Sequence, residues 1–288
     1  MNLKIKLLFS AIFFAVLFGF RQEEKSVPQL GIVSRLEQDS LVYASGFRLI
    51  GESVSRMFSP SISEEQFQQN ISRIKNARCQ VFLCNIFFPG NIKIAGPEVN
   101  ENRVLSYADT VLSRAKKAGV SCIVLGSGGP RRIPEGYDSL KAQADFVILC
   151  KKLAIVAGKY EVMIALEGLQ SSETNFLNTV KSAAAIVRAV NHPNFRLNAD
   201  IFHMMRENES PQSIIDAADV LGHCEIAEKQ TRSMPGVQGD DFKPYLRALR
   251  KVNYKGHIFI EANSSDPAND IPLSFKYLTR QLEQVYAE

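Results

Sequence analysis

Short apolar runs alternate with longer amphipathic stretches along most of the chain. Eight runs have the length and composition of strands that are buried on both faces: residues 30–34, 47–53, 79–88, 121–125, 162–170, 195–200, 221–226 and 257–262. Apolar residues at helical spacing predict helices over residues 37–44, 63–74, 104–119, 139–157, 173–190, 211–218, 242–252 and 273–285. The alternation predicts an α/β protein with a parallel sheet.

The number of strand–helix units distinguishes two parallel-sheet architectures. Eight units match a closed (β/α)8 barrel, the TIM-barrel fold. A doubly wound open sheet shows the same alternation, but it binds ligands at one crevice and gives no reason for charges at the ends of several successive strands. Because an acid stands at or near the end of each of the last four runs, we predict the barrel.

Carboxylates stand at the C-terminal ends of those four runs: Glu167, Asp200, Glu225 and Glu261. In a barrel these ends converge on one face, where active sites form. Four unpaired carboxylates would repel one another, so several would have to stay protonated unless a divalent cation, which takes oxygen ligands readily, lay among them. One such acid alone is better explained as a helix cap or the partner of an arginine. Four in register predict a metal-binding site.

Two further residues lie close to these strand ends in the sequence. His203 follows Asp200 by three residues and is a candidate for a substrate contact or for proton transfer. Arg232 follows the acidic seventh strand and is a candidate substrate contact. The glycine-rich run at residues 126–132 lacks the spacing of a phosphate-binding loop, so we expect its glycines to let the backbone turn closely at the barrel mouth.

Composition narrows the class of protein. The chain has 288 residues, 45% of them hydrophobic, which is enough to bury a large core, and we expect residues 26–288 to form one barrel domain. The net charge is only +4 and the basic residues are scattered, which argues against a nucleic-acid partner. The five cysteines are an odd number without a CxxC pair, so we interpret them as small buried hydrophobic residues.

The first 25 residues differ from the rest of the chain. Lys4 and Lys6 precede an apolar run at residues 7–20, and a polar segment follows. A basic start with a short apolar run is typical of a secretory signal peptide and is short for a membrane span. No small-x-small cleavage site is obvious, so an uncleaved N-terminal anchor is the alternative. We therefore expect an exported protein, periplasmic or extracellular, without a stable membrane span after signal cleavage.

The motifs at the strand ends resemble those of a known family. The chain is similar to the xylose-isomerase-like TIM barrels of the sugar phosphate isomerase/epimerase type, and within them to the ketose 3-epimerases that act on tagatose and psicose. The resemblance covers about residues 47–261. It is carried by Leu166-Glu167-Gly168-Leu169-Gln170, by Asp200-x-x-His203, by the turn from Arg232 to Gly236, and by Phe259-Ile260-Glu261.

The resemblance implies a metal site and a reaction. It implies a divalent metal held by Glu167, Asp200, a residue of the seventh strand and Glu261. It also implies that Glu167 and Glu261 lie on opposite faces of a sugar, where one removes a proton from the carbon beside the carbonyl and the other returns it. The metal stabilises the enediolate that forms between these two steps.

The substrate contacts and one metal ligand need separate comment. Glu173 and Arg232 match family positions that contact the substrate, and His203 and Gln170 complete the predicted binding set, although the family has asparagine at the position of Gln170. On the seventh strand, Glu225 stands where the family has a histidine ligand. If Glu225 binds the metal, an all-carboxylate set favours hard ions such as Mn²⁺, Mg²⁺ or Ca²⁺ over zinc.

Two functions follow from this pattern. We expect a metal-dependent sugar isomerase or epimerase that acts on a free ketose or related sugar, because phosphorylated sugars are mostly cytoplasmic. The alternative is a catalytically altered sugar-binding barrel in which Glu225 has replaced the histidine ligand. In both cases the partner is a small-molecule sugar. The oligomeric state stays open, since the exposed helices of barrels often pair.

Overall fold

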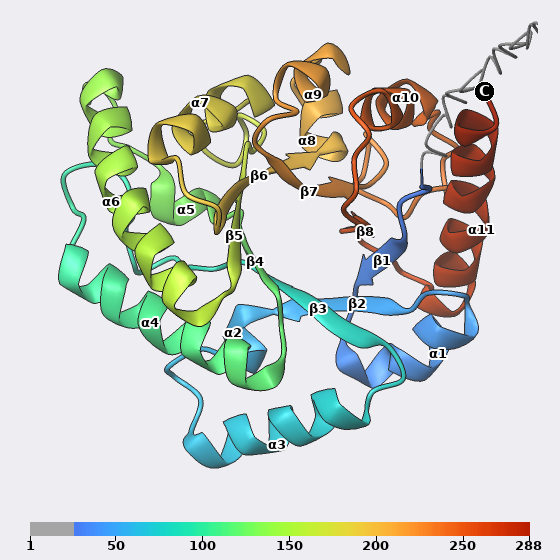
Figure 1. Cartoon of the computed structure of the whole chain (residues 1–288), viewed down its shortest axis with the longest axis horizontal. Coiled ribbons are helices and arrows are strands. Elements are labelled where there is room, and N and C mark those ends of the chain that lie inside the picture. Colours follow the sequence, from blue (N-terminus) through green and yellow to red (C-terminus); the bar gives the residue numbers. More distant parts are fainter. Residues whose placement is uncertain (1–25) are drawn as a thin grey trace, which may run out of the picture.

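The computed structural model describes residues 26–288 as a closed parallel β-barrel surrounded by helices (Figure 1). Each strand pairs with the next in sequence, and β1 pairs with β8, which confirms the predicted (β/α)8 fold. The strands are β1 (Leu30–Val33), β2 (Leu49–Ser53), β3 (Gln80–Asn85), β4 (Cys122–Leu125), β5 (Met163–Glu167), β6 (Phe195–Asp200), β7 (Leu221–Ile226) and β8 (Ile258–Ile260).

The predicted signal peptide, residues 1–25, lies outside the described residues. Between residues 26 and 288, no helix combines the length and the apolar character that crossing a bilayer requires. The five cysteines are all buried and free, as the sequence predicted.

The helices follow the strands on the outside of the barrel (Figure 1). They are α1 (Asp39–Ala44), α2 (Val54–Met57), α3 (Glu64–Asn76), α4 (Glu101–Ala118), α5 (Gly128–Arg131), α6 (Ser139–Tyr160), α7 (Val180–Val190), α8 (Ile201–Arg206), α9 (Gln212–Asp216), α10 (Lys243–Lys251) and α11 (Pro267–Tyr286), with a 3₁₀ turn, η1 (Leu36–Gln38). The short helices α2 and α8 directly follow strands, α5 begins shortly after β4, and the sequence did not predict any of the three. Helix α11 begins six residues before the predicted start at residue 273.

The predicted helix over residues 173–190 is wrong in its first part, because α7 begins only at Val180. The Leu169 N–H donates to the Leu177 carbonyl, and the Asn178 amide donates to the Leu169 carbonyl, so residues 170–179 fold back over the end of β5. Gly168 permits this close return, since a Cβ there would lie 2.8 Å from the Thr179 backbone. A loop over the barrel mouth therefore replaces the expected first turns of the helix.

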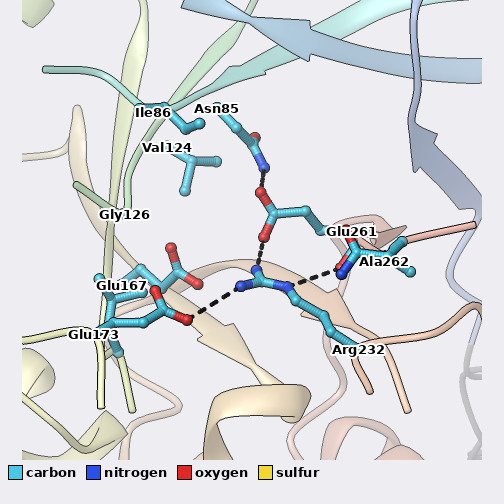
Figure 2. A pocket seen from close by; sticks show the side chains of 11 residues that line it. Asn85, Ile86, Val124, Gly126, Glu167, Glu173, Arg232, Glu261 and Ala262 are labelled. Carbon is cyan, nitrogen blue, oxygen red and sulfur yellow. Dashed lines mark hydrogen bonds and ion pairs between the residues drawn. The ribbon is translucent and has the colours of Figure 1, made fainter. Parts of the chain in front are cut away.

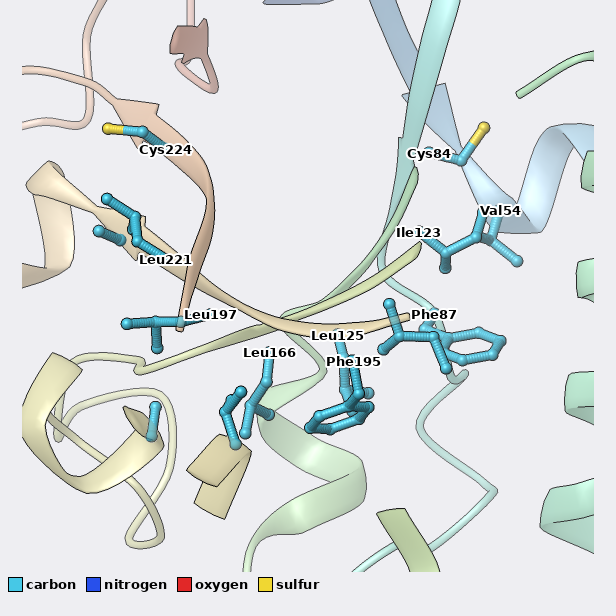
Figure 3. Packing of buried hydrophobic residues seen from close by; sticks show 14 of the residues in the cluster. Val54, Cys84, Phe87, Ile123, Leu125, Leu166, Phe195, Leu197, Leu221 and Cys224 are labelled. Atoms are coloured by element: carbon cyan, nitrogen blue, oxygen red, sulfur yellow. The ribbon is translucent and has the colours of Figure 1, made fainter. Parts of the chain in front are cut away.

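Two apolar layers hold the barrel together. Outward-facing strand residues such as Leu125, Leu166 and Leu197 belong to the large core between the sheet and the helices (Figure 3). A smaller cluster fills the interior of the barrel, with Phe259 fully buried in it. Burying apolar surface on both sides of the sheet is the main source of stability in such a fold. Because the interior is packed with side chains, a ligand can enter only from an end of the barrel.

Strand register places the four acids close together at the C-terminal ends of their strands. Glu167 of β5 is paired with Asn198 of β6, and Asp200 of β6 is paired with Glu225 of β7. Glu261 is the residue after β8. All four stand where their strands end, so they meet at the C-terminal face, whereas the chain enters β1 from the opposite face.

Candidate active site

Four carboxylates meet at the C-terminal mouth of the barrel. Glu167, Asp200, Glu225 and Glu261 each place one oxygen so that all four oxygens lie within 4.8 Å of one another. Glu167 and Glu261 line a pocket of about 450 Å³ together with Glu173 and Arg232 (Figure 2). The predicted acid cluster is thus assembled in space, and it adjoins a cavity large enough for a small ligand.

Two asparagines hold Glu225. Asn85 donates from Nδ2 to Glu225 Oε1 at 3.0 Å and also to the Glu261 carboxylate, and Asn198 donates to Glu225 Oε2 at 2.5 Å. The sequence reasoning missed both. Their positions in the sequence could have indicated this role. Asn85 is the last residue of β3, just as the acids lie at the ends of their strands. Asn198 precedes Asp200 by two residues and therefore faces the same side of β6.

Burial raises the pKa of three of these carboxyl groups. Desolvation, with the charge of Asp200 next in size, raises the pKa of Glu225 to about 7. Desolvation and the charge of Glu225 likewise raise the pKa of Glu261 to about 7. Desolvation and the same neighbouring charge raise the pKa of Glu167 well above its ordinary value. These directions match the expectation that several of the acids stay protonated when no cation lies among them.

The chemistry of the donor set suits a hard divalent cation. Glu167 Oε1 and Asp200 Oδ2 are buried and accept no hydrogen bond from the residues that the structure describes. The other Asp200 oxygen accepts the Phe202 N–H at 2.8 Å, which caps α8 and fixes the orientation of the carboxylate. Four oxygen donors with unused lone pairs fit a cation of the Mg²⁺, Mn²⁺ or Ca²⁺ type, although the donor set alone does not select one ion.

His203 lies behind the carboxylates. Its Nδ1 accepts the Gln170 N–H at 3.1 Å, so a neutral ring carries its proton on Nε2. Nε2 lies 3.3 Å from Glu167 Oε1 and 3.6 Å from Asp200 Oδ2, and burial lowers the pKa of the ring. His203 therefore lies against two acids of the cluster in this structure, and its predicted contact with substrate stays a prediction.

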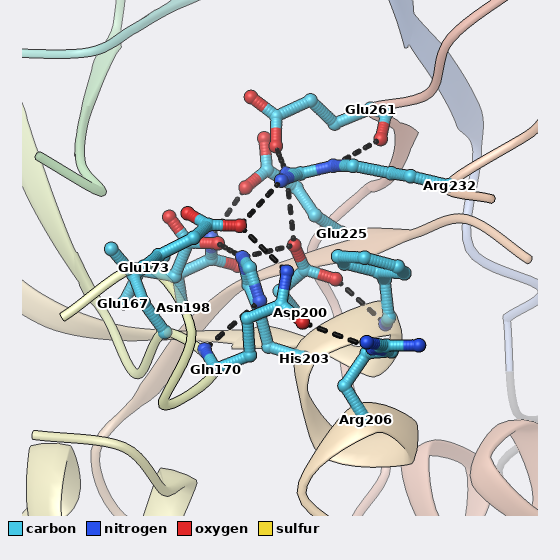
Figure 4. Close-up of polar contacts among 12 residues, drawn as sticks. Glu167, Gln170, Glu173, Asn198, Asp200, His203, Arg206, Glu225, Arg232 and Glu261 are labelled. Atoms are coloured by element: carbon cyan, nitrogen blue, oxygen red, sulfur yellow. Dashed lines mark hydrogen bonds and ion pairs between the residues drawn. The ribbon is translucent and has the colours of Figure 1, made fainter. Parts of the chain in front are cut away.

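Gln170 lies beside the pocket and contacts a residue that lines it. Its amide donates to Glu173 Oε1 at 2.8 Å, and its oxygen accepts from Arg206 Nε at 3.0 Å (Figure 4). Glu173 itself lines the pocket. Gln170 thus orients a predicted substrate contact, and its own contact with substrate also stays a prediction.

Arg232 supplies the positive charge of the site. Its guanidinium contacts the Glu261 carboxylate and lies 3.5 Å from both Asp200 Oδ2 and Glu173 Oε1 (Figure 4). Nε donates to the Glu261 carbonyl at 3.3 Å, and the group lies over the Phe202 ring at 4.7 Å. Burial opposes this charge, but the acids, Glu261 foremost, raise the pKa of Arg232 overall. One arginine is therefore shared among three carboxylates.

Glu228 fixes the turn that carries Arg232. It is fully buried, and its carboxylate accepts backbone N–H groups from Gly236, Gln238 and Gly239 at 2.6–2.8 Å. It also accepts the Ser233 hydroxyl at 2.9 Å. This constraint is local to the turn, yet it sets the position of the guanidinium in the pocket. The sequence reasoning gave Glu228 no role, although it lies three residues after Glu225.

Gly126 and Arg131 position the end of β5. A Cβ on Gly126 would lie 1.9 Å from Glu167 Oε2, so any larger residue would displace that carboxylate from its position. Arg131 is fully buried and donates from Nη1 to the Glu167 carbonyl at 2.6 Å. The glycine-rich run therefore turns closely at the barrel mouth, as predicted, and makes space for Glu167.

Fold and site together define a class: a (β/α)8 barrel whose strand ends assemble a buried carboxylate cluster with the chemistry of a divalent-cation site. The family described as xylose isomerase-like TIM barrel matches residues 41–281, and the chain belongs to this family.

Curated relatives cover part of the chain. It is 34% identical over 132 residues to L-ribulose 3-epimerase from Methylomonas sp. (strain DH-1), a match that covers 46% of each protein. It is 31% identical over 156 residues to the putative hydroxypyruvate isomerase of Homo sapiens, covering 51% of this chain and 55% of that protein. The chain thus spans about half the length of the curated relatives it matches.

Solved structures share the fold over a longer range. A structure of L-ribulose 3-epimerase aligns with a TM-score of 0.77 at 19% identity and covers 90% of this chain and 96% of the other. The structure of 3-keto-D-glucoside 4-epimerase from E. coli aligns with a TM-score of 0.73 at 20% identity. This alignment covers 88% of this chain and 99% of the other. These likenesses confirm the barrel.

Proposed function

We propose that this chain is a sugar isomerase or epimerase that moves a proton beside a carbonyl, through an enediolate, on a free ketose or related sugar. The observation that carries the proposal is the set of four carboxylate oxygens within 4.8 Å of one another at the barrel mouth. The relatives named L-ribulose 3-epimerase and hydroxypyruvate isomerase support the reaction class, because both names describe a proton moved beside a carbonyl.

We propose that Glu167, Asp200, Glu225 and Glu261 would hold a divalent ion, with Mn²⁺, Mg²⁺ or Ca²⁺ favoured by an all-oxygen donor set. When bound, such an ion supplies positive charge beside the oxygen on which negative charge develops as the C–H proton leaves. The buried oxygens of Glu167 and Asp200 that accept no hydrogen bond from the described residues support this assignment.

Glu167 and Glu261 are the proposed acid and base. They enter the pocket from β5 and from the end of β8, on different sides of it (Figure 2). One carboxylate takes the proton from the carbon, and the other, protonated, returns one to the opposite face, which inverts that carbon without any change in oxidation state.

Arg232 and Glu173 have supporting roles in this proposal. Arg232 holds the Glu261 side chain through contacts to its carboxylate and its carbonyl, and the pairing favours the ionised form of Glu261. Glu173, which is partly exposed at the pocket wall, offers an acceptor for a sugar hydroxyl. Together they orient the sugar between the two glutamates.

The test is hydrogen exchange. Residues 26–288 with Mn²⁺ added should catalyse deuterium uptake from heavy water into one or more of a panel of ketoses, read by NMR. Glu261→Gln should abolish the uptake, whereas Glu65→Gln, at an exposed acid of α3, should leave it unchanged. Absence of exchange with every sugar in the panel would contradict the proposed reaction.

The alternative, a sugar-binding barrel without turnover, is favoured by one observation. Arg232 already balances part of the charge of Asp200 and Glu261, so the cluster needs less help from a cation than four bare carboxylates would. This alternative predicts that ketoses bind in calorimetry while deuterium exchange is absent at all metal concentrations.

We also propose that the protein is exported to the periplasm or the extracellular space. The basic start and the apolar run within residues 1–25 support export. Cell fractionation tests it, and recovery of the intact chain from the cytoplasm would contradict it.

A further inference from the structure

A second cavity, of about 550 Å³, adjoins the carboxylate pocket and opens on the same face of the barrel. The segments that follow β2 and β3 form part of its wall, and one side of α4 forms the rest. Ser55 and Ser59 come from the first segment, Asn91 from the second, and Ser106 and Tyr107 from α4. Since the segments after barrel strands form the active-site face, a ligand in one cavity can extend into the other.

Ile86 separates the two cavities and lines both. It follows Asn85, whose amide points into the carboxylate cluster. Its φ is +61°, a left-handed conformation that is strained for a β-branched residue, and 53% of its surface is exposed. Hydrophobic packing does not explain why a large apolar side chain is held here. Strained residues of this kind cluster where a ligand is contacted.

The lining of the second cavity differs in chemistry from that of the first. Ser55, Ser59, Ser61, Ser106, Tyr107 and Thr110 contribute hydroxyls to it. Asn91 adds an amide and Arg103 a guanidinium that makes no ion pair among the described residues. Pro60, Pro89, Ile86 and Ile92 add apolar surface, and no carboxylate lines this cavity. Some of these hydroxyls already have partners within the protein, since Ser59 bonds Ser61 and Thr110 donates to the Ser106 carbonyl. The wall still alternates polar and apolar surface, and a sugar ring matches it by offering hydroxyls at its edge and C–H groups on its faces.

We propose that this second cavity is a subsite for another sugar ring, joined by a glycosidic bond to the ring that reacts between Glu167 and Glu261. The inference rests on the proposed function and narrows its substrate class from free ketoses to ketose-containing disaccharides or similar glycosides. Binding energy from the second ring would hold the first in place for proton transfer.

The experiment compares fructose with two disaccharides that carry a fructose unit, isomaltulose and lactulose, which differ in linkage. Deuterium uptake from heavy water with Mn²⁺ added gives kcat/KM for each, and calorimetry gives the equilibrium affinity independently of turnover. Ser106→Trp fills the subsite from an exposed position of α4. Lys117→Trp, exposed on the same helix but away from the cavity, is the matched control, and Arg103→Ala is a second variant that enlarges the subsite instead of filling it.

The expected result is that at least one disaccharide exceeds fructose in kcat/KM by about tenfold or more, since remote binding energy can be used at the reacting centre. Ser106→Trp should remove that advantage and leave the fructose rate unchanged, Arg103→Ala should reduce the advantage, and Lys117→Trp should behave as wild type. Equal values for all three sugars, or an equal loss with fructose and disaccharide in Ser106→Trp, would overturn the inference.

Failure of the proposed function gives a different pattern. If no sugar exchanges deuterium, the reaction is wrong and the calorimetric comparison decides on the subsite. Tighter binding of a disaccharide than of fructose, lost in Ser106→Trp and kept in Lys117→Trp, supports the subsite in that case. Equal binding of all three sugars, or no binding, overturns it.

Discussion

Replacing Glu225 by glutamine removes one charge from the cluster and keeps the shape of the side chain. Burial, together with the charge of Asp200, raises the pKa of Glu225 from 4.5 to about 7 in the metal-free protein. One pKa unit corresponds to about 1.4 kcal/mol, so ionising this carboxyl costs the folded state roughly 3 kcal/mol. Glutamine has no carboxyl group to ionise, so this cost is absent from the folded state of Glu225→Gln.

The sign of the pH effect follows from this raised pKa. Below pH 4.5 the carboxyl is protonated in the folded and unfolded chain, and its contribution to stability is fully present. As pH rises from 4.5 through 7, only the unfolded chain releases the proton at first, so the free energy of unfolding falls. Metal-free Glu225→Gln should therefore match wild type near pH 4.5 and exceed it at pH 8 by up to roughly 3 kcal/mol.

Hydrogen bonding around the new amide sets how much of this gain appears. Asn85 and Asn198 both donate to Glu225, whereas glutamine offers one acceptor. The oxygens of both asparagines are buried without a partner, so turning one asparagine amide over lets it accept from the glutamine. A gain well below 3 kcal/mol but above zero would mean that this exchange is incomplete.

The assay is thermal melting of chelator-treated protein between pH 4.5 and 8. For a chain of this size, roughly 3 kcal/mol corresponds to a difference of about 5–10 °C at pH 8. Added Mn²⁺ should then stabilise wild type more than the variant, since an amide is a weaker ligand than a carboxylate. Parallel melting curves across this pH range would refute the buried, raised-pKa description of Glu225, and equal stabilisation by Mn²⁺ would refute its role as a ligand.

Three other substitutions test the surroundings of the cluster. Gly126→Ala should lower deuterium exchange by about a hundredfold with an unchanged circular dichroism spectrum, because its Cβ would lie 1.9 Å from Glu167 Oε2; a rate within threefold of wild type would contradict this. Arg232→Lys should move the pH–rate profile to higher pH, because Arg232 lowers the pKa of Glu261 and lysine cannot keep both of its contacts to that residue; an unmoved profile would argue against the pairing. Glu228→Gln should lower the free energy of unfolding by about 3 kcal/mol, measured by thermal melting, since an amide cannot accept all the N–H groups of the turn; a melting temperature equal to wild type would show that the turn holds without the charge.

The barrel and its acids could be predicted because both follow from local periodicity. Buried parallel strands are nearly continuous apolar runs, and their C-terminal ends meet on one face, so acids such as Glu167 and Asp200 come together once the strand count is right. The pairing of Asp200 with Glu225 is a tertiary contact. It can still be predicted from the sequence, because both residues lie at the C-terminal ends of neighbouring strands.

Other features depend on contacts that a single segment does not reveal. Phe176, Leu177 and Val180 have helical spacing, but hydrogen bonds from Leu169 and Asn178 fold the first two into a loop. The residue type at position 232 does not indicate the left-handed backbone conformation that Arg232 adopts, with a φ of +53°. A neutral amide such as Asn198 does not stand out on a strand, although in three dimensions it is one of the two groups that hold Glu225.

The direction in which the chain enters the barrel also bears on how substrate reaches the protein. The backbone enters β1 at the face opposite the carboxylates, so a tether joined at residue 26 would be attached on the side of the barrel away from both cavities. A retained anchor would then leave the two cavities facing outward into bulk solvent, and diffusing sugars could approach without passing between the protein and its support. Tethering through that end, in a cell or on a resin, should therefore leave turnover unimpeded.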